Sequence, residues 1–342
     1  MSRERIEVRE LMIDTNPITL TRRILEDQRN LPEARGDFTI ILSSIQMACK
    51  FLSNAVRKAG INKLMKPLRK YSSEDQMQMK LNEQANEIFI NSLKFSTKIA
   101  ALASEEEENV YVVSNAEDPK YVVAFDPLDG KTGGEANISV GSIFAIWKRA
   151  NATEPGSAED FLGNKGQSIV AAGYCLYGGS TQLVLALYGR VDGYTLDTSL
   201  GEFILTHPSI HIPRRGSIYS INEGNSADWS PEVTEYIRRR KHPEVGKPPS
   251  SLRYVGSLVA DIHRTILYGG IFMYPADSRH PEGKLRVLYE AFPMSFVIEQ
   301  AGGKATDGKK RILDTEVLNL HMRVPLILGS FDDVGELEAL HH

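Results

Sequence analysis

The sequence has 342 residues, a length typical of about two domains or of one large α/β unit. Hydrophobic residues make up 42% and charged residues 25%, which excludes a disordered chain. With 40 basic and 44 acidic residues the formal net charge is -4, so no positive field attracts nucleic acid or anionic lipid, and we expect neither as a partner. Two cysteines cannot build a disulfide scaffold, which favours a reducing compartment. The charged N-terminus and the lack of an apolar run near 18 residues predict a cytoplasmic protein without a membrane span.

Two long helices are predicted in the first hundred residues. Apolar residues recur every three or four positions after Gly36-Asp37, which predicts a helix that Asp37 caps and Gly60 ends. Cys49 falls on the apolar stripe and is therefore predicted to be a core thiol. A mobile loop is expected over 61–80 and a second helix over 81–102.

The middle of the chain is predicted to be rich in strands. The run Tyr121–Phe125 is continuously apolar, which is typical of a buried strand, and it ends in Asp126-Pro127-Leu128-Asp129-Gly130. Other strands are expected at 111–113, 138–147, 168–177 and 182–188.

The last third alternates between the two kinds of element. We expect strands at 217–221 and 271–274, and helices at 231–241, 258–268 and 285–301, the last interrupted at Pro293. Interleaved helices and strands predict an α/β fold of several layers. A boundary near residue 205 divides the chain into domains 1–205 and 206–342.

An acidic cluster is the clearest chemical signal. Asp126 and Asp129 lie three residues apart in a tight turn after a buried strand, and strand ends are where α/β sheets place ligands. With the Leu128 carbonyl between them, and with Glu105 and Glu106 after the predicted helix, they offer the oxygen ligands that Mg²⁺ prefers. Two such cations can hold both oxygens of a phosphoryl transfer.

Simpler interpretations of the same residues remain open at this stage. A run of four glutamates is usually a solvated helix end, which is the interpretation favoured for Glu107 and Glu108. An isolated D-P-L-D-G is often only a turn. Gly130-Lys131-Thr132 is not a phosphate-binding P-loop, because that motif needs glycine where the chain has Phe125.

Longer segments resemble the fructose-1,6-bisphosphatase family over nearly the whole chain. They are Ser104-Glu105-Glu106, YVVAFDPLDG at 121–130, SVGSIF at 139–144, AAGY at 171–174, GSIYSINEG at 216–224, RYVGS at 253–257, YGGIFMYP at 268–275 and GKLRVLYE at 283–290. The RGDFT segment at 35–39 is most similar to plant and protist cytosolic forms.

The resemblance implies a fold, an activity and an assembly. The fold is the layered α/β/α/β/α sandwich of the sugar-phosphatase superfamily. The activity is Mg²⁺-dependent hydrolysis of the 1-phosphate of fructose 1,6-bisphosphate in gluconeogenesis, with two or more cations, for which Mn²⁺ or Zn²⁺ can substitute. The family is typically a cytoplasmic homotetramer.

The resemblance also implies three sets of site residues. The metal ligands are Glu105, Glu106, Asp126, Asp129, Glu290 and the Leu128 carbonyl, with Glu106 as the catalytic residue that activates water beside Glu105. The sugar-phosphate site is formed by Asn222, Arg253, Tyr254, Ser257, Tyr274 and Lys284, the arginine coming from a neighbouring subunit. An AMP-like site comprises Gly36, Asp37, Phe38, Thr39, Lys120, Tyr121 and Lys148.

Three positions depart from the family pattern. Asn82 replaces an aspartate that supports metal binding and proton transfer, and an amide cannot carry a proton away. Lys131, Thr132 and Gly133 replace Ser-Ser-Asn, which holds the reacting phosphate. Asn225 stands where the family usually has a tyrosine that contacts the 6-phosphate.

These departures predict weakened catalysis. The leading interpretation is a fructose-1,6-bisphosphatase, and two alternatives remain open. The first alternative is a non-catalytic, sugar-phosphate-binding regulatory relative, and the second is a phosphatase that acts on a related sugar bisphosphate. In all three cases the basic and amide residues of the sugar-phosphate set favour a phosphorylated sugar as ligand.

Overall fold

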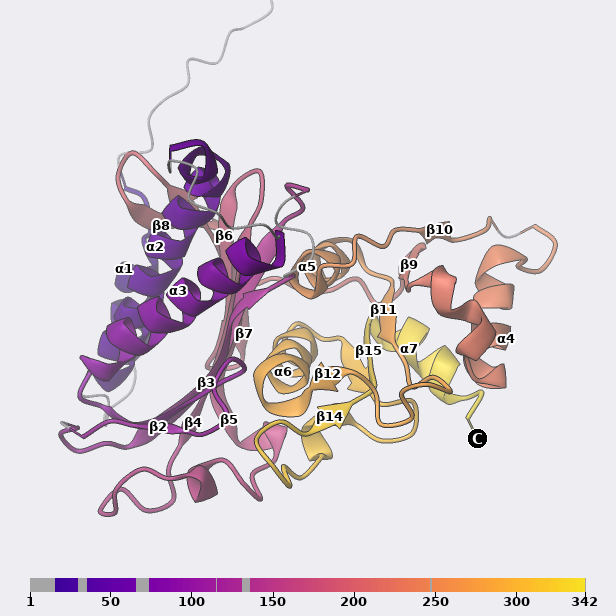
Figure 1. Ribbon diagram of the computed structural model, residues 1–342. Coiled ribbons are helices and arrows are strands. Elements are labelled where there is room, and N and C mark those ends of the chain that lie inside the picture. Colours follow the sequence, from indigo (N-terminus) through magenta and orange to yellow (C-terminus); the bar gives the residue numbers. More distant parts are fainter. Residues whose placement is uncertain are drawn as a thin grey trace, which may run out of the picture.

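The computed structural model describes residues 16–29, 36–65, 74–114, 116–130, 136–246 and 248–341. Within them, layers of helices and sheets alternate (Figure 1). Three N-terminal helices cover one face of an eight-stranded sheet, and two helices fill the space between it and a five-stranded sheet. Two further helices cover the outer face of the second sheet. The predicted five-layered α/β/α/β/α sandwich is therefore confirmed.

The first helical layer contains α1 (Leu20–Arg29), α2 (Asp37–Met65) and α3 (Glu74–Lys94). Among the described helices, α2 is the one that is long and apolar enough to cross a membrane, over Asp37–Lys58. Its residues Ile41, Ile45 and Cys49 are buried in the core beneath this layer, as in the core helix of a globular domain. Cys49 is thus the core thiol that the sequence predicts.

The eight-stranded sheet has the order β2-β1-β3-β4-β5-β6-β7-β8. All neighbouring strands are antiparallel except β1 and β3, which are parallel. The strands are β1 (Ile99–Ser104), β2 (Tyr111–Val112), β3 (Tyr121–Asp129), β4 (Val140–Lys148), β5 (Ile169–Tyr177), β6 (Thr181–Leu187), β7 (Arg190–Asp197) and β8 (Glu202–His207).

The second half of the chain builds the other three layers. The central helices are α5 (Leu258–Tyr268) and α6 (Phe292–Gln300), and the outer ones are α4 (Pro231–Lys241) and α7 (Phe331–Glu338). The second sheet has the order β10-β9-β11-β15-β13. Its strands are β9 (Ile218–Ser220), β10 (Ser251–Leu252), β11 (Ile271–Tyr274), β13 (Lys304–Thr306) and β15 (Leu326–Gly329), beside a short ribbon of β12 (Leu285–Arg286) and β14 (Arg323–Val324).

The first five residues of β3, Tyr121–Phe125, are all apolar because both faces of the strand are covered. Val123 and Phe125 point into the core beneath α1–α3, where Phe125 stacks on Phe89 with ring centroids 4.9 Å apart. Val122 and Ala124 point into the core that contains α5 and α6. The predicted buried strand is confirmed, and its two-sided burial explains why no polar alternation marks it.

Two of the expected elements near the N-terminus are wrong in part. The helix predicted over 81–102 begins at Glu74 and ends at Lys94, and Ile99–Ser104 forms β1 instead. Alanine and leucine in this segment favour a helix locally, but pairing with β3 buries all six residues. Gly60 does not end α2, which continues to Met65, so helices occupy most of the predicted loop at 61–80, and residues 66–73 lie outside the described part.

The C-terminal predictions are confirmed at 231–241 and 258–268, and at 285–301 the prediction is correct in part, since 287–300 is helical. That segment begins as β12, continues as a π-helical turn at Val287–Ala291 and becomes α6 at Phe292. Pro293 lies in the first turn of α6 rather than interrupting a helix, which is favourable because a first-turn N–H has no partner within the helix. The sequence analysis also missed β8 and the strands after residue 301.

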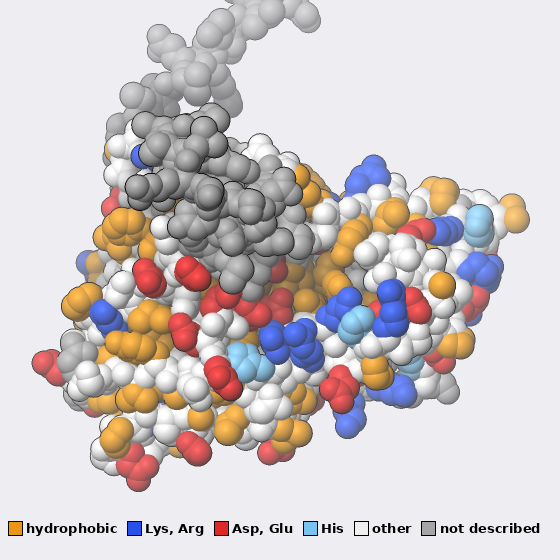
Figure 2. Space-filling view, in the orientation of Figure 1, with side chains coloured by type: hydrophobic (Ala, Val, Ile, Leu, Met, Phe, Trp, Pro, Cys, Tyr) orange, Lys and Arg blue, Asp and Glu red, His pale blue; other side chains and the backbone are white. Residues whose placement is uncertain are grey.

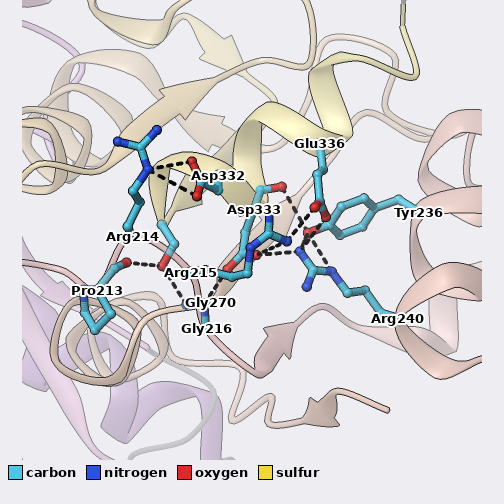
Figure 3. A network of polar contacts seen from close by, with 11 residues as sticks. Pro213, Arg214, Arg215, Gly216, Tyr236, Arg240, Gly270, Asp332, Asp333 and Glu336 are labelled. Carbon is cyan, nitrogen blue, oxygen red and sulfur yellow. Dashed lines mark hydrogen bonds and ion pairs between the residues drawn. The ribbon is translucent and has the colours of Figure 1, made fainter. Parts of the chain in front are cut away.

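A buried aspartate joins the outermost helical layer to the second sheet (Figure 3). Asp333 in α7 is fully buried and accepts hydrogen bonds from the Gly216 N–H at 2.8 Å and from Arg240 Nη2 of α4 at 2.7 Å. The Tyr236 hydroxyl donates to the Asp333 carbonyl and accepts from Arg240. One carboxylate therefore fixes α4, α7 and the loop before β9 relative to one another.

We expect Asp333→Ala to lower the free energy of unfolding by about 3 kcal/mol or more, because it removes the buried partner of Arg240. Asp332→Ala is the matched control: Asp332 pairs with Arg214, whose side chain is 76% exposed, and such surface pairs contribute at most about 1 kcal/mol. Urea unfolding followed by circular dichroism measures both variants. Equal losses would contradict the structural role of Asp333.

Candidate active site

Parallel pairing of two strands creates the acidic edge of the first sheet. Ser104 of β1 pairs with Phe125 of β3, and the Glu105 N–H donates to the Phe125 carbonyl at 3.1 Å. Glu105 and Asp126 therefore leave the ends of neighbouring parallel strands at the same edge. The expectation that Glu105 and Glu106 follow a helix is wrong, since they follow β1.

Three carboxylates meet at one point. One oxygen from each of Asp126, Asp129 and Glu290 lies within 4.8 Å of the other two. The D-P-L-D segment belongs to β3 rather than to a turn after it, and between Asp126 and Asp129 its register with β4 shifts by one residue. Such a bulge changes the direction of the side chains that follow it, and here it lets two aspartates of one strand approach the same point.

Each of these carboxylates accepts a hydrogen bond from a different backbone amide. Leu128 N–H donates to Asp126 at 3.0 Å, and Val259 N–H, in the first turn of α5, donates to Asp129 at 3.3 Å. The Arg286 N–H donates to Glu290. The three amides come from the bulge, from a helix N-terminus and from β12, so the cluster forms where segments from both halves of the chain meet.

The cluster brings three acidic side chains to one point. Burial, with a further contribution from Asp129, raises the pKa of Glu290 to about 8, because the ionised form is desolvated and faces other negative charges. A divalent cation would offset this negative charge, and an all-oxygen donor set is typical of hard ions such as Mg²⁺. The residues present thus fit a metal ion, and Asp126, Asp129 and Glu290 would hold it.

Glu105 lies close enough to Glu290 to contribute to its raised pKa, but neither Glu105 nor Glu106 belongs to the group of three acids that meet within 4.8 Å. Glu105 is partly buried and one of its oxygens lies 3.7 Å from Arg286 Nε. The Glu106 side chain is exposed, and its N–H donates to the Ser104 hydroxyl at 3.2 Å. The sequence analysis missed Arg286, although it lies within the GKLRVLYE segment, because an arginine without a known neighbour carries no signal of its own.

Asparagines of α3 line the approach to these glutamates. Asn86 accepts from the Ser104 hydroxyl at 2.7 Å and donates to Glu107 at 2.6 Å. Asn82 lies one helical turn earlier, on the same face, in the middle of α3 rather than at its start. It is buried, and its Oδ1 atom has no hydrogen-bond partner among the residues that the structure describes.

A small pocket in the second half collects part of the predicted sugar-phosphate set. Its lining includes Asn222, Asn225 and Tyr274 together with Trp229 and Met273. Asn222 caps a short 3₁₀ helix by accepting from the Gly224 N–H, and Asn225 accepts from Arg279 at 3.3 Å. The pocket therefore offers amide groups, a phenol and the Asp277 carboxylate beside apolar side chains.

The loop at 253–257 connects this pocket with the acids. Burial, followed by smaller contributions that include Tyr274 and Asp129, raises the pKa of Tyr254 to about 12. Ser257 caps α5, at whose N-terminus Asp129 is held. The fully buried Asp261, which the sequence analysis missed, shapes the loop by accepting from the Val255 and Gly256 N–H groups.

Two basic residues of the predicted set lie outside that pocket. Arg253 is exposed and its guanidinium donates to the adjacent Leu252 carbonyl at 2.7 Å. Lys284 is half-buried directly before β12, four residues after the turn at His280. Neither is among the described residues that line the pocket.

The AMP-like residues gather at the opposite end of β3. Tyr121 begins β3 and pairs with Lys148 of β4, and its ring packs edge-on against Phe38 with centroids 5.0 Å apart. Lys120 Nζ lies 3.6 Å from an Asp37 oxygen at the start of α2. Gly36 has a positive φ of 85° directly before that helix, and the Thr39 hydroxyl donates to Gln28 of α1.

The space-filling view shows how these charges are distributed. Acidic side chains gather near the middle of this face, with basic side chains directly beside them, between the two halves of the molecule (Figure 2). A site that combines bound cations with a phosphorylated ligand needs both signs of charge.

The predicted departures at Lys131, Thr132 and Gly133 lie outside the described residues.

Comparison with known proteins identifies the family. Residues 18–208 match the model of the fructose-1,6-bisphosphatase N-terminal domain, and residues 212–342 match that of its C-terminal domain. The cytosolic fructose-1,6-bisphosphatase of Brassica napus is 51% identical over 324 residues, which cover 95% of this chain and 95% of the relative. The cytosolic enzyme of Arabidopsis thaliana is 51% identical over 327 residues, which cover 96% of this chain and 95% of the relative.

Solved structures agree with the sequence relatives. The Leishmania major fructose-1,6-bisphosphatase in its holo form is 43% identical with a TM-score of 0.88, covering 95% of this chain and 99% of that one. The T-state form of the same enzyme is 44% identical with a TM-score of 0.86 and the same coverage. Because both domain models and full-length relatives match in order, the chain belongs to the fructose-1,6-bisphosphatase family.

Proposed function

We propose that this protein is a cytosolic fructose-1,6-bisphosphatase, which hydrolyses the 1-phosphate of fructose 1,6-bisphosphate to release fructose 6-phosphate in gluconeogenesis. The observation that carries the proposal is the meeting of Asp126, Asp129 and Glu290 next to the loop that leads to the Asn222–Tyr274 pocket. Its relatives are named for this activity and as cytosolic. Mg²⁺ is the proposed metal, with Glu105, Glu106 and the Leu128 carbonyl as further ligands.

The chain's own residues have distinct roles in this mechanism. Bound Mg²⁺ would supply positive charge for the phosphate oxygens. Glu106, which is exposed at the edge of the cluster, is the proposed general base that takes a proton from the attacking water. Asn222, Tyr254 and Tyr274 would hold the sugar and its 6-phosphate, and Lys284 would add positive charge near the acids.

Asn82 supports a second candidate function. A buried amide oxygen without a partner among the described residues stands where the family pattern has an acid that relays a proton. Binding of a sugar phosphate with little turnover, as in a regulatory relative, is the alternative that this observation favours. Phosphate release separates the two functions.

An oligomer and an AMP site are further parts of the proposal. Arg253 is exposed at the end of β10, where a guanidinium can reach a neighbouring subunit, and a homotetramer would let it complete that subunit's phosphate site. AMP is the proposed ligand of the cluster at the start of α2 and β3, where backbone amides of a helix N-terminus suit a phosphate.

Asp126→Ala tests the metal site. We expect it to abolish Mg²⁺-dependent phosphate release from fructose 1,6-bisphosphate, because the cation loses a buried carboxylate ligand at the centre of the cluster. Asp118→Ala is a matched control, since Asp118 pairs with Lys120 at the other end of β3. Phosphate release is measured with and without Mg²⁺, and circular dichroism verifies folding. Full Mg²⁺-dependent activity in a folded Asp126→Ala protein would refute the assignment.

Asn82→Asp tests the weakened-catalysis hypothesis. We expect kcat to rise by about 10²-fold or more, the usual effect of an acid–base group, with little change in substrate affinity. The same substitution combined with Lys131→Ser, Thr132→Ser and Gly133→Asn should raise kcat further. If the unmodified chain already turns over at about 10 s⁻¹, near the enzyme median, these positions are dispensable.

Subunit mixing tests the role of Arg253. Arg253→Ala and Asp126→Ala chains are each expected to be inactive or weak alone, and their mixture should recover part of the activity because some sites then receive both intact groups. Light scattering of the unmodified chain reports the assembly. A monomer, or a mixture no more active than its components, would count against a shared site.

A further inference from the structure

Ser142 lies opposite the bulge that carries the metal-binding aspartates. Asp126 pairs with Ile143 and Asp129 pairs with Gly141 across β3 and β4. Both Pro127 and Leu128 therefore face a single residue of β4, Ser142. Proline has no N–H to donate, so the regular ladder cannot continue at this position.

The Ser142 hydroxyl gives the Pro127 carbonyl a hydrogen-bond partner within the bulge. It is fully buried and donates to the Pro127 carbonyl at 2.7 Å. Its oxygen also lies 2.8 Å from the Tyr177 hydroxyl of β5. A carbonyl can only accept, so the serine proton is directed to Pro127 and the tyrosine must donate to the serine.

The far end of this chain of hydroxyls reaches the first helical layer. Tyr177 is buried, and its hydroxyl interacts with the thiol of Cys49 in α2. Burial raises the pKa of Tyr177 well above its ordinary value, which keeps the phenol protonated and able to donate. The hydrogen bonds from Tyr177 to Ser142 and from Ser142 to Pro127 thus have defined directions and join β5, β4 and the bulge, with Cys49 of α2 beside the tyrosine.

We propose that Ser142, oriented by Tyr177, is a positioning residue that holds the Pro127–Leu128 bulge so that Asp126 and Asp129 face the same cation. This inference rests on the proposed metal-dependent function. Without the hydroxyl, the buried Pro127 carbonyl loses its partner, and rotation of that peptide to recover one would turn the flanking carboxylates away from Glu290.

Direct metal binding by the full chain is the test, with Mn²⁺ as the probe and free Mn²⁺ measured by electron paramagnetic resonance. Ser142→Ala should weaken Mn²⁺ binding by about tenfold or more, as loss of a partner behind a metal ligand usually does. Ser142→Thr keeps the hydroxyl and should restore most of the affinity. Binding of fructose 6-phosphate, measured by calorimetry, should change little.

Ser53→Ala is the matched control. The Ser53 hydroxyl is buried and lies 2.6 Å from that of Thr181, joining α2 to β6 without contact to the bulge. It should leave Mn²⁺ affinity unchanged. Equal weakening by Ser53→Ala and Ser142→Ala would overturn the proposal in favour of general loosening of the sheet.

Tyr177→Phe tests the orienting group and carries the experiment if Ser142→Ala does not fold. It should weaken Mn²⁺ binding by a smaller factor, about threefold. The double variant Ser142→Ala with Tyr177→Phe should bind Mn²⁺ as weakly as Ser142→Ala alone, because no serine hydroxyl then remains to orient. Unchanged Mn²⁺ affinity in folded Ser142→Ala protein would overturn the positioning role of Ser142. Unchanged Mn²⁺ affinity in folded Tyr177→Phe protein would overturn the orienting role of Tyr177. Failure of the unmodified chain to bind Mn²⁺ would instead refute the proposed metal-dependent function.

Discussion

Mutual repulsion among buried carboxylates is the constraint on which the site depends. Asp126, Asp129 and Glu290 converge to within 4.8 Å, and the raised pKa of Glu290 reflects the free energy needed to keep them ionised together. A backbone amide donates to each of them, and a cation between them would offset their negative charge. The bulge, the start of α5 and the π-helical turn are therefore parts of one electrostatic arrangement, although they are far apart in the sequence.

That arrangement explains why the two halves of the chain share a site. The first sheet supplies the aspartates, whereas the segments around β12 and the N-terminus of α5 supply the third acid and two of the amides. The pocket of Asn222 and Tyr274 belongs to the second sheet and reaches the acids through Tyr254. Small relative movements of the halves would change the proposed metal site and its position relative to the proposed sugar-phosphate site together, since the metal site is built from residues of both halves.

Strand β3 connects the acids with the predicted nucleotide cluster. Tyr121 at its start and Asp126 are five residues apart, roughly 16 Å along an extended strand. The strand is buried on both faces and flanked by β1 and β4, so it is a stiff connection. Helix α2 runs from the same cluster to the Cys49 thiol that interacts with Tyr177. Two structural routes thus join the two ends of the first sheet.

The sequence by itself determined the family, the layered α/β class and the buried strand before Asp126, because apolar periodicity and long motifs are local properties of the chain. It also pointed to Asp126 and Asp129, whose spacing is short. Only the tertiary structure decided that 99–104 is a strand, since its local composition favours a helix and pairing with β3 overrides it. Three contacts of the site join residues that lie 15 to 181 positions apart in the sequence. They are the contact of Glu290 with the two aspartates, that of Arg286 with Glu105, and that of Ser142 with Pro127. Such contacts arise from strand register and layer packing, which no local pattern of residues encodes.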